Sequence, residues 1–181
     1  MKKIILLIAL IFAALIVPQN AGAVSPNESA KLAFASPLGQ LMDQDKKIRA
    51  VENIFKKYDS PLVDEASNYV KYAEEYGVDW RLLPAIAGLE SSFGKHLMPG
   101  SHNAYGWGGG HIYFESWEEG IMKINKAIRA NYMDKWGAKD VWSIGPIYAE
   151  SPTWSVRVNY FMEQINQEYL RLSTFSSIST I

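Results

Sequence analysis

Hydrophobic residues recur at helical spacing along most of the chain between residues 45 and 172. The expected helices cover residues 48–55, 62–73, 81–90, 116–132 and 152–172. Residues that commonly begin helices support several of these boundaries: Ser116 stands three residues before Glu119, and Ser151 precedes Pro152. The segment from Gly100 to Phe114 lacks this period. The pattern therefore predicts a mainly α-helical domain with one small glycine- and aromatic-rich loop or short-hairpin lobe.

The two ends of the chain differ from this helical body. Residues 24–44 and 173–181 are rich in small and polar residues and show little periodicity. We therefore expect a linker over residues 24–44 and a flexible tail over residues 173–181. A short helix over residues 33–42 that docks on the domain is the alternative for part of the linker.

The first 23 residues have the layout of a secretory signal. A positive head, Lys2 and Lys3, precedes an apolar run of 14 residues from Ile4 to Val17, and Ala21-Gly22-Ala23 provides a cleavage site. An uncleaved anchor is the alternative, but the run is shorter than the roughly 20 residues that cross a bilayer as a helix. We therefore expect a secreted, periplasmic or wall-associated protein that has no membrane contact after cleavage.

The amino-acid composition excludes several kinds of partner and site. The chain has 181 residues, 48% of them hydrophobic, which suits one globular domain, and we expect a monomer. A net charge of −1 argues against a nucleic-acid partner. The absence of cysteine excludes disulfides, thiolate metal sites and thiol nucleophiles. His96, His102 and His111 lack the spacing of a helical zinc site, so we expect neither a metal nor another cofactor.

Glu90 occupies a position where the apolar stripe of its predicted helix calls for a hydrophobic residue. The stripe includes Leu83 and Ile86, and Glu90 follows Leu83 by seven residues on the same face. Removal of a carboxyl group from water favours its protonated form, and the negative end of a helix dipole acts in the same direction. General-acid cleavage of a glycosidic bond requires such a protonated carboxyl group. The alternative is a helix-end glutamate that faces solvent or pairs with Arg81 or Lys95.

The loop that follows combines glycine with aromatic residues. Between Ser101 and Gly110 it contains four glycines together with Tyr105 and Trp107. Glycine lets the backbone approach a ligand closely, and aromatic faces stack on the apolar faces of sugar rings while polar groups bind hydroxyls and acetamides. The loop is thus predicted to be a sugar platform. A small hydrophobic core beneath a glycine-rich turn is the alternative.

Three motifs, taken in order, resemble the lysozyme-like superfamily. The first runs from Tyr76 to Gly94 and contains Glu90-Ser91, the second is Asn103-Ala104-Tyr105-Gly106-Trp107, and the third runs from Tyr148 to Trp154. The resemblance covers roughly residues 59–167. Within the superfamily, the spacing is closest to bacterial endo-β-N-acetylglucosaminidases of the flagellar-muramidase type, which include mannosyl-glycoprotein endo-β-N-acetylglucosaminidase-like domains. Soluble lytic transglycosylases are related to that group.

This resemblance implies a lysozyme-like glycosidase domain over residues 45–172. Its expected substrate is peptidoglycan or a related N-acetylhexosamine polymer, cut at β-1,4 bonds with Glu90 as the catalytic acid. The motifs and the loop together indicate a set of substrate-binding residues: Ser91, Asn103, Tyr105, Gly106, Trp107, Tyr113, Tyr148 and Trp154. Trp154 has a second interpretation as plain core, and core is the expected place of Trp136, Trp142 and Tyr160.

Departures from the family pattern leave the reaction type open. The segment Gly106-Trp107-Gly108-Gly109 stands where transglycosylases usually have a Gly-Leu-Met-Gln-like segment. Inverting hydrolysis needs a second carboxylate at ~6.5 to 9.5 Å from the first. The candidates are Glu115, Glu118, Glu119 and Glu150, and helix capping explains two of them, Glu118 and Glu119. A lytic transglycosylase, which needs no second carboxylate, and a non-catalytic wall-binding module on the same fold are the alternatives.

Overall fold

The computed structural model describes residues 31 and 35–178, and these residues contain helices and loops but no strand. The helical elements are α3 (Pro37–Lys57), η1 (Val63–Glu65), α4 (Ala66–Tyr76), α5 (Leu82–Ser91), α6 (Trp117–Ala127), η2 (Ile128–Lys135), α7 (Val141–Tyr148) and α8 (Trp154–Ile178). The expected mainly α-helical class is therefore confirmed. The lobe between Gly100 and Phe114 is an irregular loop rather than a hairpin. The expected signal sequence, residues 1–23, lies outside the described residues.

The helical body extends further at both ends than the sequence pattern predicts. Helix α3 begins at Pro37, inside the expected linker, because the Oγ of Ser36 accepts the backbone N–H of Gly39 at 3.0 Å and caps the helix. Helix α8 continues to Ile178. The hydroxyls of Ser173 and Thr174 donate to backbone carbonyls one turn earlier, at 2.9 and 3.1 Å, and thereby stay compatible with the helix.

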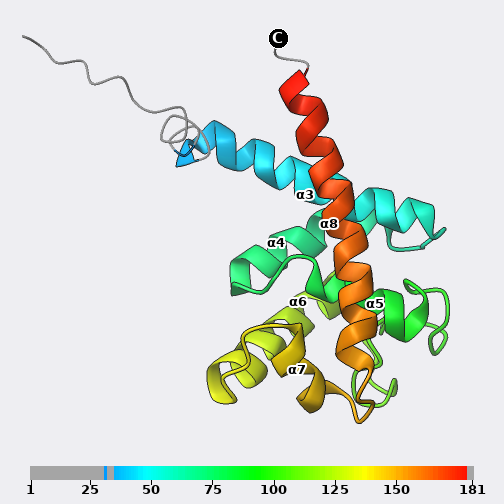
Figure 1. The fold of residues 1–181 in the computed structure, drawn as a ribbon. Coiled ribbons are helices and arrows are strands. Elements are labelled where there is room, and N and C mark those ends of the chain that lie inside the picture. The colour runs from blue at the N-terminus through cyan, green and yellow to red at the C-terminus, as the bar shows by residue number, and fades with distance from the viewer. Residues whose placement is uncertain (1–30, 32–34, 179–181) are drawn as a thin grey trace, which may run out of the picture.

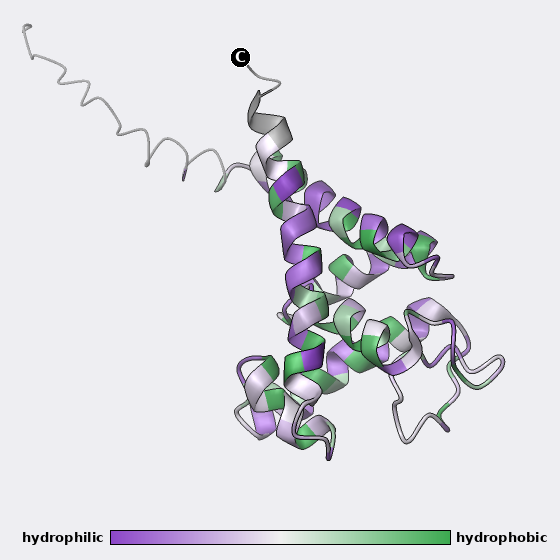
Figure 2. Ribbon diagram, turned by 45° about the vertical axis from the view of Figure 1, so that its right-hand side comes forward, coloured by the Kyte–Doolittle hydropathy of each residue, from purple (hydrophilic) through white to green (hydrophobic). Residues whose placement is uncertain are grey.

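The long helix α8 runs along the helical body and contacts several other helices (Figure 1). Helices α3, α5 and α7 pack on it, and α4 lies between α3 and α6. Hydrophobic residues concentrate where the helices meet (Figure 2), and the core includes fully buried Phe55, Tyr69, Leu83 and Ile86. None of the helices in the described part of the chain is both long and apolar enough to cross a membrane. This arrangement brings the end of α5 and the start of α8 together.

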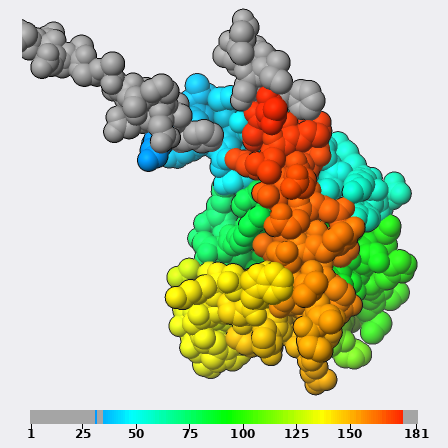
Figure 3. Space-filling view, viewed as in Figure 1, coloured from blue at the N-terminus to red at the C-terminus, as the bar shows by residue number. Residues whose placement is uncertain are grey.

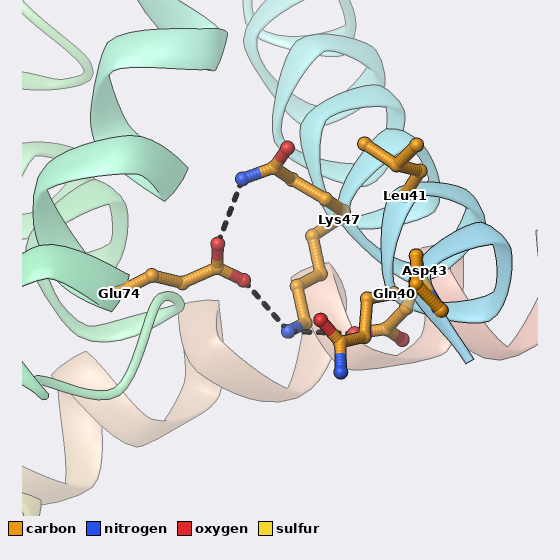
Figure 4. A pocket seen from close by; sticks show the side chains of 7 residues that line it. Gln40, Leu41, Asp43, Lys47 and Glu74 are labelled. Carbon is orange, nitrogen blue, oxygen red and sulfur yellow. Dashed lines mark hydrogen bonds and ion pairs between the residues drawn. The ribbon is translucent and has the colours of Figure 1, made fainter. Parts of the chain in front are cut away.

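A polar network fixes the N-terminal half of α3 against α4 and α8 (Figure 4). The Nζ of Lys47 lies 2.7 Å from Asp43 and 2.9 Å from Glu74. Gln44 donates a hydrogen bond to Glu74 at 2.9 Å, and the hydroxyl of Tyr169 donates to Asp43 at 2.5 Å. The network borders an open pocket of about 570 Å³. These contacts explain why this polar part of α3 is held on the domain.

Disruption of this network should destabilise the protein at neutral pH and matter less in acid. Burial raises the pKa of Asp43, but hydrogen bonds from Lys47 and Tyr169 outweigh it, so the net pKa is lower than usual. A carboxylate with a lowered folded-state pKa stabilises the fold above its unfolded-state pKa, and this contribution is lost as the pH falls through the folded-state value. We expect Lys47→Met to lower the free energy of unfolding by about 1 kcal/mol at pH 7. Below about pH 4 the difference from the wild type should shrink.

Urea unfolding at pH 7 and pH 3 measures this difference. Lys56→Met is the matched control, because Lys56 pairs with Glu52 on the exposed side of the same helix. Its effect should stay near zero at both pH values. If Lys47→Met lowered the free energy of unfolding by the same amount at both pH values, the ion pairs of Lys47 would not be the cause of the lower stability.

Candidate active site

Glu90 lies in the last turn of α5, where the helix emerges from the core. Leu83 and Ile86 on the same face are fully buried, whereas the side chain of Glu90 is exposed. The expectation that the apolar stripe would remove Glu90 from water is therefore wrong, although Ala87 before it and Ser91 after it are buried. The surroundings of the carboxylate come from segments far away in the sequence.

Neither neighbouring cation neutralises Glu90. Arg81 pairs with Asp79 at 2.6 Å, and Lys95 donates to the backbone carbonyl of Tyr58 at 2.6 Å. The alternative interpretation of Glu90 as one half of a surface ion pair with either residue is thus not observed.

The carboxylate of Glu90 is held between the start of α8 and the glycine-rich loop. Its Oε1 accepts a hydrogen bond from the indole Nε1 of Trp154 at 2.8 Å. Its Oε2 faces Gly106, where a Cβ atom would lie only 3.1 Å away. Gly106 also has a φ of +64°, which disfavours other residues. Glycine at this position therefore leaves room for the carboxylate and for any group that approaches it.

A series of aromatic rings leads away from this carboxylate. This aromatic cluster consists of Trp107, Tyr132, Trp136, Tyr148 and Trp154. Tyr148 stacks on Trp154 with centroids 4.7 Å apart, and Trp107 lies 5.8 Å from Tyr148. Tyr132 lies 6.1 Å from Trp107 and 5.3 Å from Trp136. Exposure rises from 2% at Trp154, through three half-buried rings, to 52% at Trp136. The cluster thus runs from the buried Trp154, which binds Glu90, to the exposed Trp136.

Tyr148 is fixed by its hydroxyl, which donates to the backbone carbonyl of Tyr105 at 2.7 Å. Burial raises the pKa of Tyr148 well above its ordinary value, and the charge of Glu90 adds to the effect. Tyr148 therefore stays a neutral phenol and a hydrogen-bond donor at physiological pH. Its hydroxyl is therefore engaged within the protein.

Tyr105 belongs to the core rather than to a sugar platform. It is fully buried, and its hydroxyl lies 2.8 Å from that of Tyr69. Burial raises the pKa of Tyr105 as well. The small-core interpretation of the loop therefore holds for Tyr105, whereas the half-buried Trp107 joins the aromatic cluster.

Asn103 and Ser91 brace the loop from inside. The side-chain amide of Asn103 donates to the carbonyls of Trp107 and Ile112 at 2.9 and 3.0 Å, and its Oδ1 accepts the N–H of Trp107 at 3.0 Å. The Oγ of Ser91 lies 2.8 Å from the carbonyl oxygen of Ala104. Both residues are buried. They build the framework of the site, in place of the substrate contacts expected from the sequence.

The remaining expected residues lie outside this centre. Tyr113 is 58% exposed and does not belong to the aromatic cluster. Glu118 accepts the hydroxyl of Tyr72 at 2.7 Å, and Glu119 accepts the N–H of Glu115 at 2.7 Å, so both have local structural roles. Among the described residues, no three His, Asp or Glu side chains gather in a way that could hold a metal ion. The other two candidates, Glu115 and Glu150, are exposed, and the second carboxylate stays unassigned.

Sequence reasoning missed Tyr132 and Trp136 as members of the cluster. The interpretation of Trp136, Trp142 and Tyr160 as core is wrong, because they are 52%, 52% and 61% exposed. Tyr132 and Trp136 are four residues apart, which places them on one helical face. That spacing could have indicated that the two rings lie together. The contact of Tyr132 with Trp107 is seen only in the folded structure.

Gly106→Ala should impair the site more than the fold. A Cβ at residue 106 would crowd the Oε2 of Glu90, and the positive φ adds about 1 kcal/mol of strain. Gly100→Ala is the matched control, since its φ is +74° and a Cβ there would meet nothing within 4 Å. The melting temperature should fall by a similar amount in both variants. The affinity for a chitooligosaccharide should fall only in Gly106→Ala. If Gly106→Ala and Gly100→Ala bound the chitooligosaccharide equally well, Gly106 would not border the binding surface.

This arrangement combines a proton-carrying group with surfaces suited to a sugar. A carboxyl group at Glu90 can donate or accept a proton, and aromatic rings such as those of Trp107 and Tyr148, both partly exposed, can stack on apolar sugar faces. No family model, curated protein or solved structure matches this chain.

Proposed function

We propose that this chain is an exported glycosidase that cleaves β-1,4 bonds in peptidoglycan or a related N-acetylhexosamine polymer. The observation that carries the proposal is the exposed carboxylate of Glu90, held at 2.8 Å by the Nε1 of Trp154 at one end of the aromatic cluster. Glutamates at helix ends are common, but this one is oriented by a buried indole and flanked by partly exposed rings. Residues from the three lysozyme-like motifs, Glu90, Gly106 and Tyr148 among them, meet at this point.

In the proposed reaction Glu90 acts as the general acid. A sugar chain lies along the half-buried rings of Trp107 and Tyr148 and covers the carboxyl group of Glu90, and this removal from water favours its protonated form. The protonated Glu90 then donates to the glycosidic oxygen as the bond from that oxygen to the anomeric carbon breaks. Proton transfer leaves a carboxylate on Glu90. The Nε1–H of Trp154 stabilises that negative charge, because hydrogen bonds to charged acceptors are the stronger ones.

Two related chemistries can complete the reaction. In hydrolysis, water attacks the anomeric carbon, either directly or after attack by the acetamido group of the substrate. In a lytic transglycosylase, the C6 hydroxyl of the same sugar attacks and yields an anhydro product. Both use Glu90 in the same way, and neither the acetamido route nor transglycosylation needs a second carboxylate. We favour hydrolysis because the Gly106–Gly109 segment departs from the transglycosylase pattern.

Turnover distinguishes this enzyme from a wall-binding module on the same fold. Protein comprising residues 24–181 is incubated with insoluble peptidoglycan, and soluble fragments are counted over time. The proposal predicts a continuing release that exceeds one fragment for each protein molecule. Tight binding to the wall without release would favour the binding module instead.

A further inference from the structure

The far end of the aromatic cluster is exposed and carries a cation. Trp136 follows directly after η2 and is 52% exposed, and its ring contacts Tyr132 edge-on at 5.3 Å. The segment around Trp136, yellow in Figure 3, adjoins the orange start of α8. Single exposed rings are common on protein surfaces, and Trp142 is equally exposed. Trp136 differs from Trp142 in its contact with Tyr132, which joins it to the aromatic cluster. Trp136 is thus the outermost member of a ring series that begins at Glu90.

Lys135 adds a positive charge at the same place. Its Nζ lies 5.6 Å from the centroid of the Trp136 ring. Within the described part of the chain, no carboxylate pairs with Lys135, whereas Arg129 on the same helix pairs with Asp134 at 2.8 Å. An ammonium group beside an exposed aromatic ring suits a sugar that carries a carboxylate.

We propose that Trp136 and Lys135 form a distal binding position for a sugar ring several units away from the cleaved bond. The position takes an acidic N-acetylated glycan, with the sugar on the indole and its carboxylate near Lys135. The inference rests on the proposed function, because Glu90 defines the point from which the position is remote. It deepens that function, since it makes this enzyme specific for long, acidic chains rather than for short, neutral ones.

The test compares glycans of different length in Glu90→Gln protein, so that binding is measured without cleavage. Calorimetry with a chitohexaose and a chitotriose gives the two affinities. Trp136→Ala should weaken binding of the hexasaccharide about fivefold to tenfold and change that of the trisaccharide by less than about twofold. Trp142→Ala is the matched control, because Trp142 is also 52% exposed but lies on α7 outside the aromatic cluster. It should leave both affinities unchanged.

The charge is tested with glycan strands that contain muramic acid, compared with chitooligosaccharides of equal length. Lys135→Gln should weaken binding of the acidic strands about threefold and leave the neutral ones unchanged. Lys126→Gln, at an exposed lysine of α6 outside the cluster, serves as the control. Equal loss for acidic and neutral strands would overturn the preference for acidic glycan.

The outcomes separate this inference from the proposed activity. Full affinity of Trp136→Ala for the hexasaccharide, or the same loss in Trp142→Ala, overturns the distal position even where the wild type cleaves peptidoglycan. Binding that depends on Trp136 in a protein whose wild type releases no fragments supports the position and overturns the activity. Failure to bind any glycan overturns both.

Discussion

Glu90→Gln is expected to lower the rate of glycan cleavage at least ~100-fold while the protein stays folded. The amide has the size of the carboxyl group and can still accept the hydrogen bond of Trp154, but it cannot donate a catalytic proton. Glu90 is exposed, so the change should move the melting temperature very little. The cleavage rate is measured as the initial rate of fragment release. The melting temperature is measured by thermal melts on the same preparations.

The control for this variant is Glu163→Gln, at an exposed glutamate on α8 outside the aromatic cluster. It changes the net charge by the same amount and should retain the wild-type rate. A folded Glu90→Gln protein with the wild-type rate would remove Glu90 from the mechanism. Equal loss in both variants would indicate that the charge of the protein towards the wall, rather than an acid in the site, controls the rate.

Tyr105→Ala is expected to lower the free energy of unfolding by about 3 to 5 kcal/mol. The ring of Tyr105 is fully buried, and its hydroxyl is bonded to that of Tyr69. Truncation leaves a cavity and an unpaired buried hydroxyl on Tyr69, which adds to the cost. Chemical denaturation measures the loss. Tyr105→Phe should cost about 1 to 3 kcal/mol, because it removes the hydrogen bond and keeps the ring.

Tyr113→Ala is the matched control from the same loop. Tyr113 is 58% exposed, so its truncation should change stability by less than about 0.5 kcal/mol. If Tyr105→Ala instead melted like the wild type and lost affinity for sugar, Tyr105 would be a platform residue that contacts the sugar.

Local sequence signals predicted most of the helices. Ser116 caps α6 by accepting the N–H of Glu119 at 3.1 Å, as its spacing predicts. Helix α7 was not predicted, because Gly145 and Pro146 interrupt its short pattern. In the structure Asp140 caps it, and Gly145 lets α8 approach closely: a Cβ there would lie 3.2 Å from the ring of Trp154.

The sequence predicted Glu90 as the centre of the candidate site. It did not predict which residues surround the carboxylate. The position of Glu90 on its helix singled it out, but periodicity could not show where the core ends. The partners of the carboxylate, Trp154 and Gly106, come from segments 64 and 16 residues away along the chain. Whether a ring such as Tyr105 or Trp136 is buried also depends on which helices cover it. Such facts follow from tertiary packing, which no local pattern contains.

Mass spectrometry of the fragments released from peptidoglycan in heavy-oxygen water shows whether Glu90 drives hydrolysis of the glycan. We expect soluble fragments from the wild-type protein that carry one heavy oxygen at a new reducing end, and none from Glu90→Gln. Anhydro fragments without the label would keep Glu90 as the acid and assign the chain to the transglycosylase reaction. A folded wild-type protein that binds the wall and releases no fragments would contradict the claim that Glu90 cleaves a glycan.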